Sequence, residues 1–100
     1  MTVVMSMRWP GVTQDQYDAV RDRVRWEELA PAGGQIHVAW FDGDALHVTD
    51  VWESADHFGR FSESQLMPAV KEAGIDGEPE VAFSPLHRRF IAPGVSGASS

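Results

Sequence analysis

The sequence predicts one α+β domain in which four antiparallel strands and two helices follow the ferredoxin-like order β, α, β, β, α, β. Three observations lead to this prediction. Segments of strand character lie at 2–8, 35–41, 45–53 and 80–91. Helix start signals stand between the first two segments and between the last two. A short Gly-containing stretch separates the middle pair, which is typical of a β-hairpin.

The first strand and the first helix are signalled by local patterns. Residues 2–8 alternate apolar and polar side chains with a period of two, and a Pro-Gly turn follows them. Thr13 can cap a helix, and Gln16 three residues later completes a capping box. The helix must end before Pro31. Its apolar stripe, which we expect to be core, consists of Tyr17, Val20 and Val24.

The predicted hairpin carries apolar side chains on both of its faces. Its strands are joined by three loop residues, 42–44. Two helices can cover only one face of a sheet, so the other face needs a partner. We expect Ala39, Phe41 and Val51 on this second face. Self-association is the most economical way to cover it, so the sequence predicts a homodimer in which two sheets close a barrel.

The second helix begins at Ser54, a favoured N-cap residue. Pro68 does not fit unstrained in a helix interior, so we expect a break near Met67 and a short continuation that Gly74 terminates. Pro85 lies within the last predicted strand and lacks the backbone N–H that a sheet ladder needs. That strand is therefore predicted to lie at an edge.

The element order has few compact solutions once crossovers are right-handed and unknotted. The commonest one places the strands in the order four, one, three, two. We expect a single domain over residues 1–93, followed by a flexible tail of Gly, Ser and Ala over residues 94–100.

Several functional classes conflict with the composition. The net charge of −7 and the isoelectric point near 4.8 oppose binding to nucleic acid or to anionic membranes. Cysteine is absent, and no Gly-rich phosphate loop, nucleophile elbow or metal-ligand spacing occurs. We therefore expect neither cofactor nor metal. No signal segment is recognisable at the N-terminus, which makes the cytoplasm the default location.

The segments Val48–Ser54 and Phe58–Phe61 resemble the strand-to-helix signature of the dimeric α+β barrel superfamily, the antibiotic biosynthesis monooxygenase-like proteins. More narrowly, stretches such as Pro85-Leu86-His87 look like a group of small, uncharacterised actinobacterial proteins. The likeness covers residues 2–90. It implies cofactor-independent oxidation, cyclisation or isomerisation of an aromatic or polyketide-like compound. Haem-degrading members use an Asn, which this chain lacks.

Three residues are candidates for proton transfer. His37 and His87 are the first choices, because imidazole titrates near neutral pH, and a closed dimer can bring the two together across its interface. The alternative is that each is a strand histidine bonded to backbone or water. Asp50 lies on an otherwise apolar strand face, where a carboxylate needs a partner. Arg8 is a plausible partner, and a purely structural ion pair is the alternative.

The predicted ligand-binding residues are mostly aromatic or flexible apolar side chains. Tryptophan rings can stack on an aromatic substrate, although core packing is the commoner role. Methionine can line a cavity or simply fill gaps. The sequence thus favours a small-molecule enzyme; the alternatives are a non-catalytic dimer that binds a hydrophobic metabolite or acts as an accessory subunit, and a stress-response protein without a ligand. The residues predicted to bind the ligand are Trp40, Trp52, Met5, Met67 and Arg8.

Overall fold

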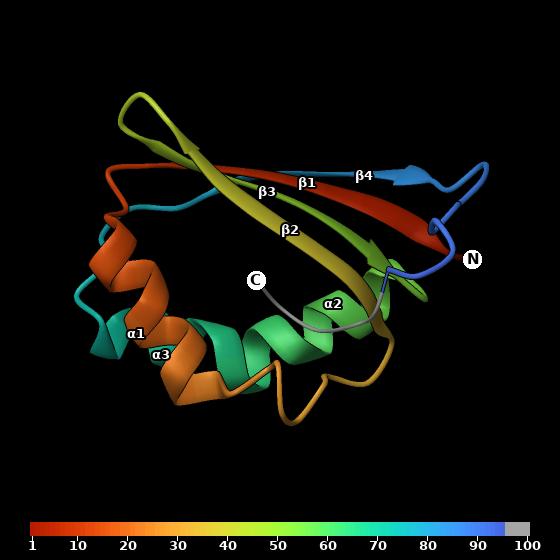
Figure 1. The fold of residues 1–100 in the computed structure, drawn as a ribbon. Coiled ribbons are helices and arrows are strands. Elements are labelled where there is room, and N and C mark those ends of the chain that lie inside the picture. Colours follow the sequence, from red (N-terminus) through yellow and green to blue (C-terminus); the bar gives the residue numbers. More distant parts are fainter. Residues whose placement is uncertain (96–100) are drawn as a thin grey trace.

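The computed structural model describes residues 1–95, which fold into a four-stranded sheet with helices on one side (Figure 1). The predicted tail of residues 94–100 falls largely on residues 96–100, which lie outside the described residues. The element order is the predicted one, apart from the division of the second helix. In chain order the elements are β1 (Val3–Pro10), α1 (Gln14–Val24), β2 (Gly34–Asp42), β3 (Ala45–Trp52), α2 (Ala55–Phe61), η1 (Ser62–Leu66), α3 (Met67–Glu72) and β4 (Glu80–Pro85).

The sheet has the strand order β2-β3-β1-β4, and every neighbouring pair is antiparallel. This confirms the predicted order four, one, three, two and the ferredoxin-like fold. The last strand is shorter than predicted. Pro85 pairs with Val3, where β1 begins, so no part of β1 remains for later residues to pair with. One further contact joins the N–H of Leu86 to the carbonyl of Thr2 at 3.0 Å.

The helix caps agree with the sequence. Thr13 and Gln16 form both bonds of the capping box, and the hydroxyl of Ser54 accepts from a backbone N–H in the first turn of α2. The break near Pro68 takes the form of a π-helical turn, η1, after which α3 begins with Pro68 in its first turn. Pro68 has no backbone N–H, and it lies in the first turn of α3, where a helix does not need that donor.

The core lies between the sheet and the helices. Met5 in the central strand is fully buried, and the indole N–H of Trp9 donates to the carbonyl of Asp76 at 3.1 Å. Helices α1, α2 and α3 cover this one face of the sheet (Figure 1). None of the helices within residues 1–95 is both long and apolar enough to span a bilayer. The core side chains from the helices are Val20, Val24, Phe58, Phe61, Ala69 and Val70.

The two faces of β2 are the reverse of the prediction. Ala39 and Phe41 pack against the core, while Val38 and Trp40 are 51% and 45% exposed on the bare face. The cause is the length of the hairpin loop. Only residues 43 and 44 separate the strands, whereas a three-residue loop was predicted. A register change of one residue moves every side chain of a strand to the opposite face.

Candidate functional site

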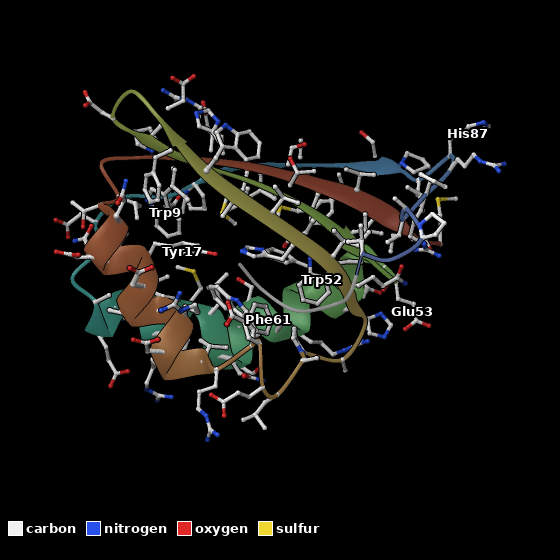
Figure 2. The ribbon with its side chains drawn as sticks, in the orientation of Figure 1. Trp9, Tyr17, Trp52, Glu53, Phe61 and His87 are labelled. Atoms are coloured by element: carbon white, nitrogen blue, oxygen red, sulfur yellow. The ribbon has the colours of Figure 1, made fainter. Side chains whose placement is uncertain are left out.

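A cavity of about 610 Å³ lies between the sheet and the helices. This volume is within the usual range for small-molecule pockets. Figure 2 shows Tyr17, Trp52 and Phe61 in this space, between the sheet and the helices. The lining is mainly apolar and aromatic. Its polar or titratable members are Tyr17, Glu27, Gln35, His37 and Asp50, together with the indoles of Trp9, Trp26 and Trp52.

Four side chains form a continuous chain of hydrogen bonds along the cavity. The Tyr17 hydroxyl lies 2.7 Å from Nε2 of His37. Nδ1 of His37 lies 2.7 Å from Oδ1 of Asp50. The other carboxylate oxygen, Oδ2, accepts from the indole N–H of Trp52 at 3.0 Å. Asp50 is buried, with 6% of its surface exposed, and both of its oxygens are satisfied.

The sheet register brings these groups together. His37 in β2 and Asp50 in β3 are directly paired, and paired residues share a face. Trp52 follows Asp50 by two positions and therefore points to the same side. Tyr17 comes from the other layer, in the first turns of α1 immediately after the cap at Thr13. Strand pairing thus fixes one half of the group and helix packing the other.

The bonding pattern defines the protons. An ionised carboxylate only accepts hydrogen bonds, so the proton of neutral His37 lies on Nδ1 and points at Asp50. Nε2 is then an acceptor for the Tyr17 hydroxyl. Burial, followed by the negative charges of Asp50 and Glu27, raises the pKa of Tyr17 to about 12. The phenol therefore stays protonated and serves as a hydrogen-bond donor to His37.

The segment between α1 and β2 forms one wall of the cavity. Trp26 lies at a ring distance of 5.1 Å from His37 and 5.7 Å from Tyr17. The end of this segment is held by the β3–α2 turn, because the N–H of Glu53 donates to the carbonyl of Gly33 at 2.8 Å. Gly33 has a φ of +86°, and a Cβ there would lie 2.5 Å from the ring of His57.

Four of the residues predicted from sequence meet in the cavity. His37, Asp50 and Trp52 belong to the hydrogen-bonded chain, and Met5 lines the same space. Two aromatic residues were not predicted as site residues. Tyr17 was assigned to the helix stripe of the core. Trp26 lies in the loop that begins after Arg25, whose left-handed conformation ends α1. Sequence patterns do not show which residues of a loop turn back toward a sheet.

The other predicted site residues lie elsewhere. Trp40 is on the bare face, stacked on His47 at 5.3 Å. Arg8 also points away from the cavity and pairs with Glu80 at 3.1 Å, so it is not the partner of Asp50. Arg8 is three residues from Met5, the register partner of Asp50, and an odd separation along a strand reverses the face.

Met67 and His87 also lie apart from the cavity. Met67 is 37% exposed and is not among the described residues that line it. His87 is exposed beyond the end of β4, away from Tyr17 and Trp52 (Figure 2). Within one chain it therefore cannot act with His37. Residues 1–95 contain no group of three or more His, Cys, Asp or Glu side chains that could hold a metal ion.

The fold is that of solved antibiotic biosynthesis monooxygenase-like proteins. A variant of SnoaB, a cofactor-independent oxygenase from Streptomyces nogalater, is 14% identical with a TM-score of 0.63, over 88% of this chain and 95% of that one. A monooxygenase from the gene ActVA-Orf6 of Streptomyces coelicolor, in complex with nanaomycin D, is 20% identical with a TM-score of 0.59; the match covers 90% of this chain and 91% of that one. A putative antibiotic biosynthesis monooxygenase from Deinococcus radiodurans is 10% identical with a TM-score of 0.55; the match covers 94% of this chain and 100% of that one.

The likeness does not extend to sequence. No protein-family model matches the chain, and no curated protein matches it. At these identities the comparison establishes the shared fold, and the chemistry has to be argued from the residues of this chain.

Proposed function

We propose that this protein is a small-molecule enzyme that removes an acidic proton from an aromatic compound bound in the cavity. The observation that carries the proposal is the chain Tyr17–His37–Asp50, which reaches from a cavity of about 610 Å³ to a buried carboxylate. A base oriented by a second group is the usual arrangement for general acid–base catalysis. The aromatic lining suits a planar substrate.

The geometry favours a relay through Tyr17. The substrate proton passes to the Tyr17 oxygen while the original Tyr17 proton passes to Nε2 of His37, so the phenol never carries a charge. In the imidazolium that results, the Nδ1–H of His37 still donates to Asp50, and the negative charge of that carboxylate stabilises the cation. The substrate is left as an anion. Such an anion can react with dioxygen or rearrange, which corresponds to the oxidation or isomerisation implied by the sequence resemblance.

The structural neighbours support the oxidative version. One is a cofactor-independent oxygenase, and another is a monooxygenase solved with nanaomycin D. We therefore propose cofactor-independent oxidation of an aromatic or polyketide-like compound, with cyclisation or isomerisation as the related outcomes of the same proton transfer.

The test separates proton transfer from oxidation. Anthrone carries an acidic CH₂ group, so its exchange with D₂O can be followed by NMR without oxygen, and its oxidation by oxygen uptake. We expect the protein to accelerate the exchange of anthrone, and we expect His37→Gln to reduce the exchange rate about 10²-fold or more. His47→Gln, on the bare face of β3, is the matched control. Equal exchange by the His37→Gln variant and the unchanged protein would refute the relay.

The predicted second histidine can be tested in the same assay. His87 has no contact with the cavity of its own chain, so we expect His87→Gln to retain activity. A loss of activity would place His87 in the site of a partner subunit.

A non-catalytic role is the second candidate, and the apolar cavity lining favours it. A hydrophobic-ligand-binding or accessory protein would bind anthrone without accelerating exchange, and the His37→Gln variant would bind it equally well. The two functions therefore differ in exchange rate and not in affinity.

We also propose that the chain forms a homodimer through the bare face of the sheet. Val38 and Trp40 leave about half of their surfaces exposed there. The two side chains are two positions apart on the same face of β2, so they form one continuous apolar area, which favours a contact surface. Sedimentation is expected to give a dimer at micromolar concentration, and Trp40→Glu is expected to give a monomer. A folded monomer of the unchanged chain would contradict the proposal.

A further inference from the structure

The charges of the cavity have one sign. Its described lining residues include two carboxylates, Asp50 and Glu27, and neither arginine nor lysine. Asp50 is bonded to an imidazole and an indole, not to a guanidinium or an ammonium group. Glu27 lines the cavity from the α1–β2 segment and is exposed. An anionic ligand would lose its hydration in this space without meeting a cationic side chain.

Tyr17 reports the electrostatics of this space. Its pKa is raised to about 12, first by burial and then by Asp50 and Glu27. Arg21 acts in the opposite direction but is not among the described lining residues, and Asp18 adds to the rise. A ligand anion beside Tyr17 is subject to the same burial and the same two carboxylates, so its ionised form is disfavoured in the same way.

The hydrogen-bonding capacity of the site points to the same kind of ligand. The hydrogen of the Tyr17 hydroxyl is directed at Nε2 of His37. What remains for a ligand is the set of lone pairs on the Tyr17 oxygen, which accept hydrogen bonds. The site therefore suits a ligand that donates.

We propose that the cavity selects aromatic compounds in their uncharged, hydroxyl-bearing form and excludes the corresponding carboxylates and phosphate esters. The inference rests on the proposed function and specifies its substrate class. The substrate enters protonated and becomes an anion only inside the cavity, where proton transfer makes His37 a cation at the same moment. Once His37 loses that proton, the two carboxylates favour departure of an anionic product.

Equilibrium dialysis of the full chain at pH 7 tests this preference with four probes that share one ring system. These are 1-naphthol, 1-methoxynaphthalene, 1-naphthoate and 1-naphthyl phosphate. We expect 1-naphthol to bind at least tenfold more tightly than the two anions. The methyl ether, which lacks the donor, is expected to bind several-fold more weakly than 1-naphthol.

Two variants test whether a carboxylate of the lining causes the weaker binding of the anionic probes. Glu27→Gln is expected to narrow the gap between 1-naphthol and 1-naphthoate several-fold, because it removes one carboxylate from the lining. Glu63→Gln, an exposed position in η1 that is not among the described lining residues, is the matched control and is expected to leave the gap unchanged. Equal affinity for 1-naphthol and 1-naphthoate, or no binding of 1-naphthol, would overturn the inference.

The result is distinguishable from failure of the proposed function. Binding is measured without turnover, and His37→Gln leaves both carboxylates in place, so that variant is expected to keep the preference for the neutral probe. Activity that survives in His37→Gln would refute the relay and leave the charge preference standing. Loss of the charge preference with an intact His37 dependence would refute only the present inference.

Discussion

Replacement of Asp50 by asparagine is expected to reverse the tautomer of His37. The carboxylate accepts from Nδ1 of His37 through one oxygen and from the indole N–H of Trp52 through the other. Asparagine has a single acceptor oxygen, which the indole N–H occupies, so its NH₂ group faces His37. Nδ1 then becomes an acceptor and the histidine proton moves to Nε2. In that form Nε2 can no longer accept a proton from Tyr17.

The magnitude follows from the two bonds. A hydrogen bond to a charged group contributes about 1.5–3 kcal/mol and a neutral one about 0.5–1.5 kcal/mol, so two exchanges lose about 2–3 kcal/mol. Relief of a buried charge opposes this loss, which leaves a net destabilisation of about 1–2 kcal/mol. For a domain of this size, that lowers Tm by roughly 5–15 °C. Activity is expected to fall by about 10²–10⁴-fold, because the base is in the wrong tautomer.

Three measurements check this prediction. Nitrogen-15 NMR of the imidazole distinguishes a proton on Nδ1 from one on Nε2, thermal unfolding gives the change in Tm, and the anthrone exchange assay gives the activity. Asp42→Asn, at an exposed position in the same hairpin, controls for the loss of a carboxylate. If the Asp50→Asn variant kept the Nδ1 proton, or kept full exchange activity, the assigned role of Asp50 would be wrong.

Three further predictions concern titration, the cavity wall and the first helix. Tyr17 is the single tyrosine of the chain, so its absorbance titration is expected to have its midpoint near 12, above the ordinary tyrosine pKa of 10.0. Between these two pH values the folded state binds more protons than the unfolded state, so the free energy of unfolding is expected to fall as the pH rises, and Tyr17→Phe is expected to abolish this slope. Gly33→Ala is expected to destabilise the fold more than Gly11→Ala, as measured by urea unfolding, because both positions have a φ near +85° but only Gly33 lies against the ring of His57; equal effects would contradict the contact. Thr13→Ala is expected to lower the free energy of unfolding by about 1 kcal/mol through loss of the capping box, with Thr13→Ser close to neutral.

Local signals predicted most of the fold. The caps at Thr13 and Ser54 and the edge position of β4 followed from patterns that span a few residues. The strand order followed from the order of the elements and the preference for right-handed, unknotted crossovers. The register of the hairpin was the weak point. In the structure Asp42 pairs with Ala45, so that Ala39 pairs with Val48, a core residue of β3. A loop one residue longer would pair Ala39 with His47 instead, and would turn Ala39, Phe41 and Trp40 to the wrong faces of the sheet.

Only part of the site was predicted, because some of its contacts depend on how distant elements pack together. His37 stood out because imidazole titrates near neutral pH, and Asp50 stood out because a carboxylate on an apolar strand face needs a partner. Tyr17 had the spacing of a core residue, and its contact with His37 depends on how α1 lies over the sheet, which no local pattern specifies. Arg8 was placed by strand proximity alone, and the alternation of side chains along β1 directs it to the other face.

The α1–β2 segment has a consequence for how the protein can change. The proton-handling groups of His37 and Asp50 are held by paired strands, whereas Trp26, Ala30 and Pro31 belong to a connection that is tied down at its far end by Gly33. Loops tolerate substitution better than paired strands do. The substrate range can therefore evolve, or be engineered, through substitutions in the α1–β2 segment that leave His37 and Asp50 unchanged.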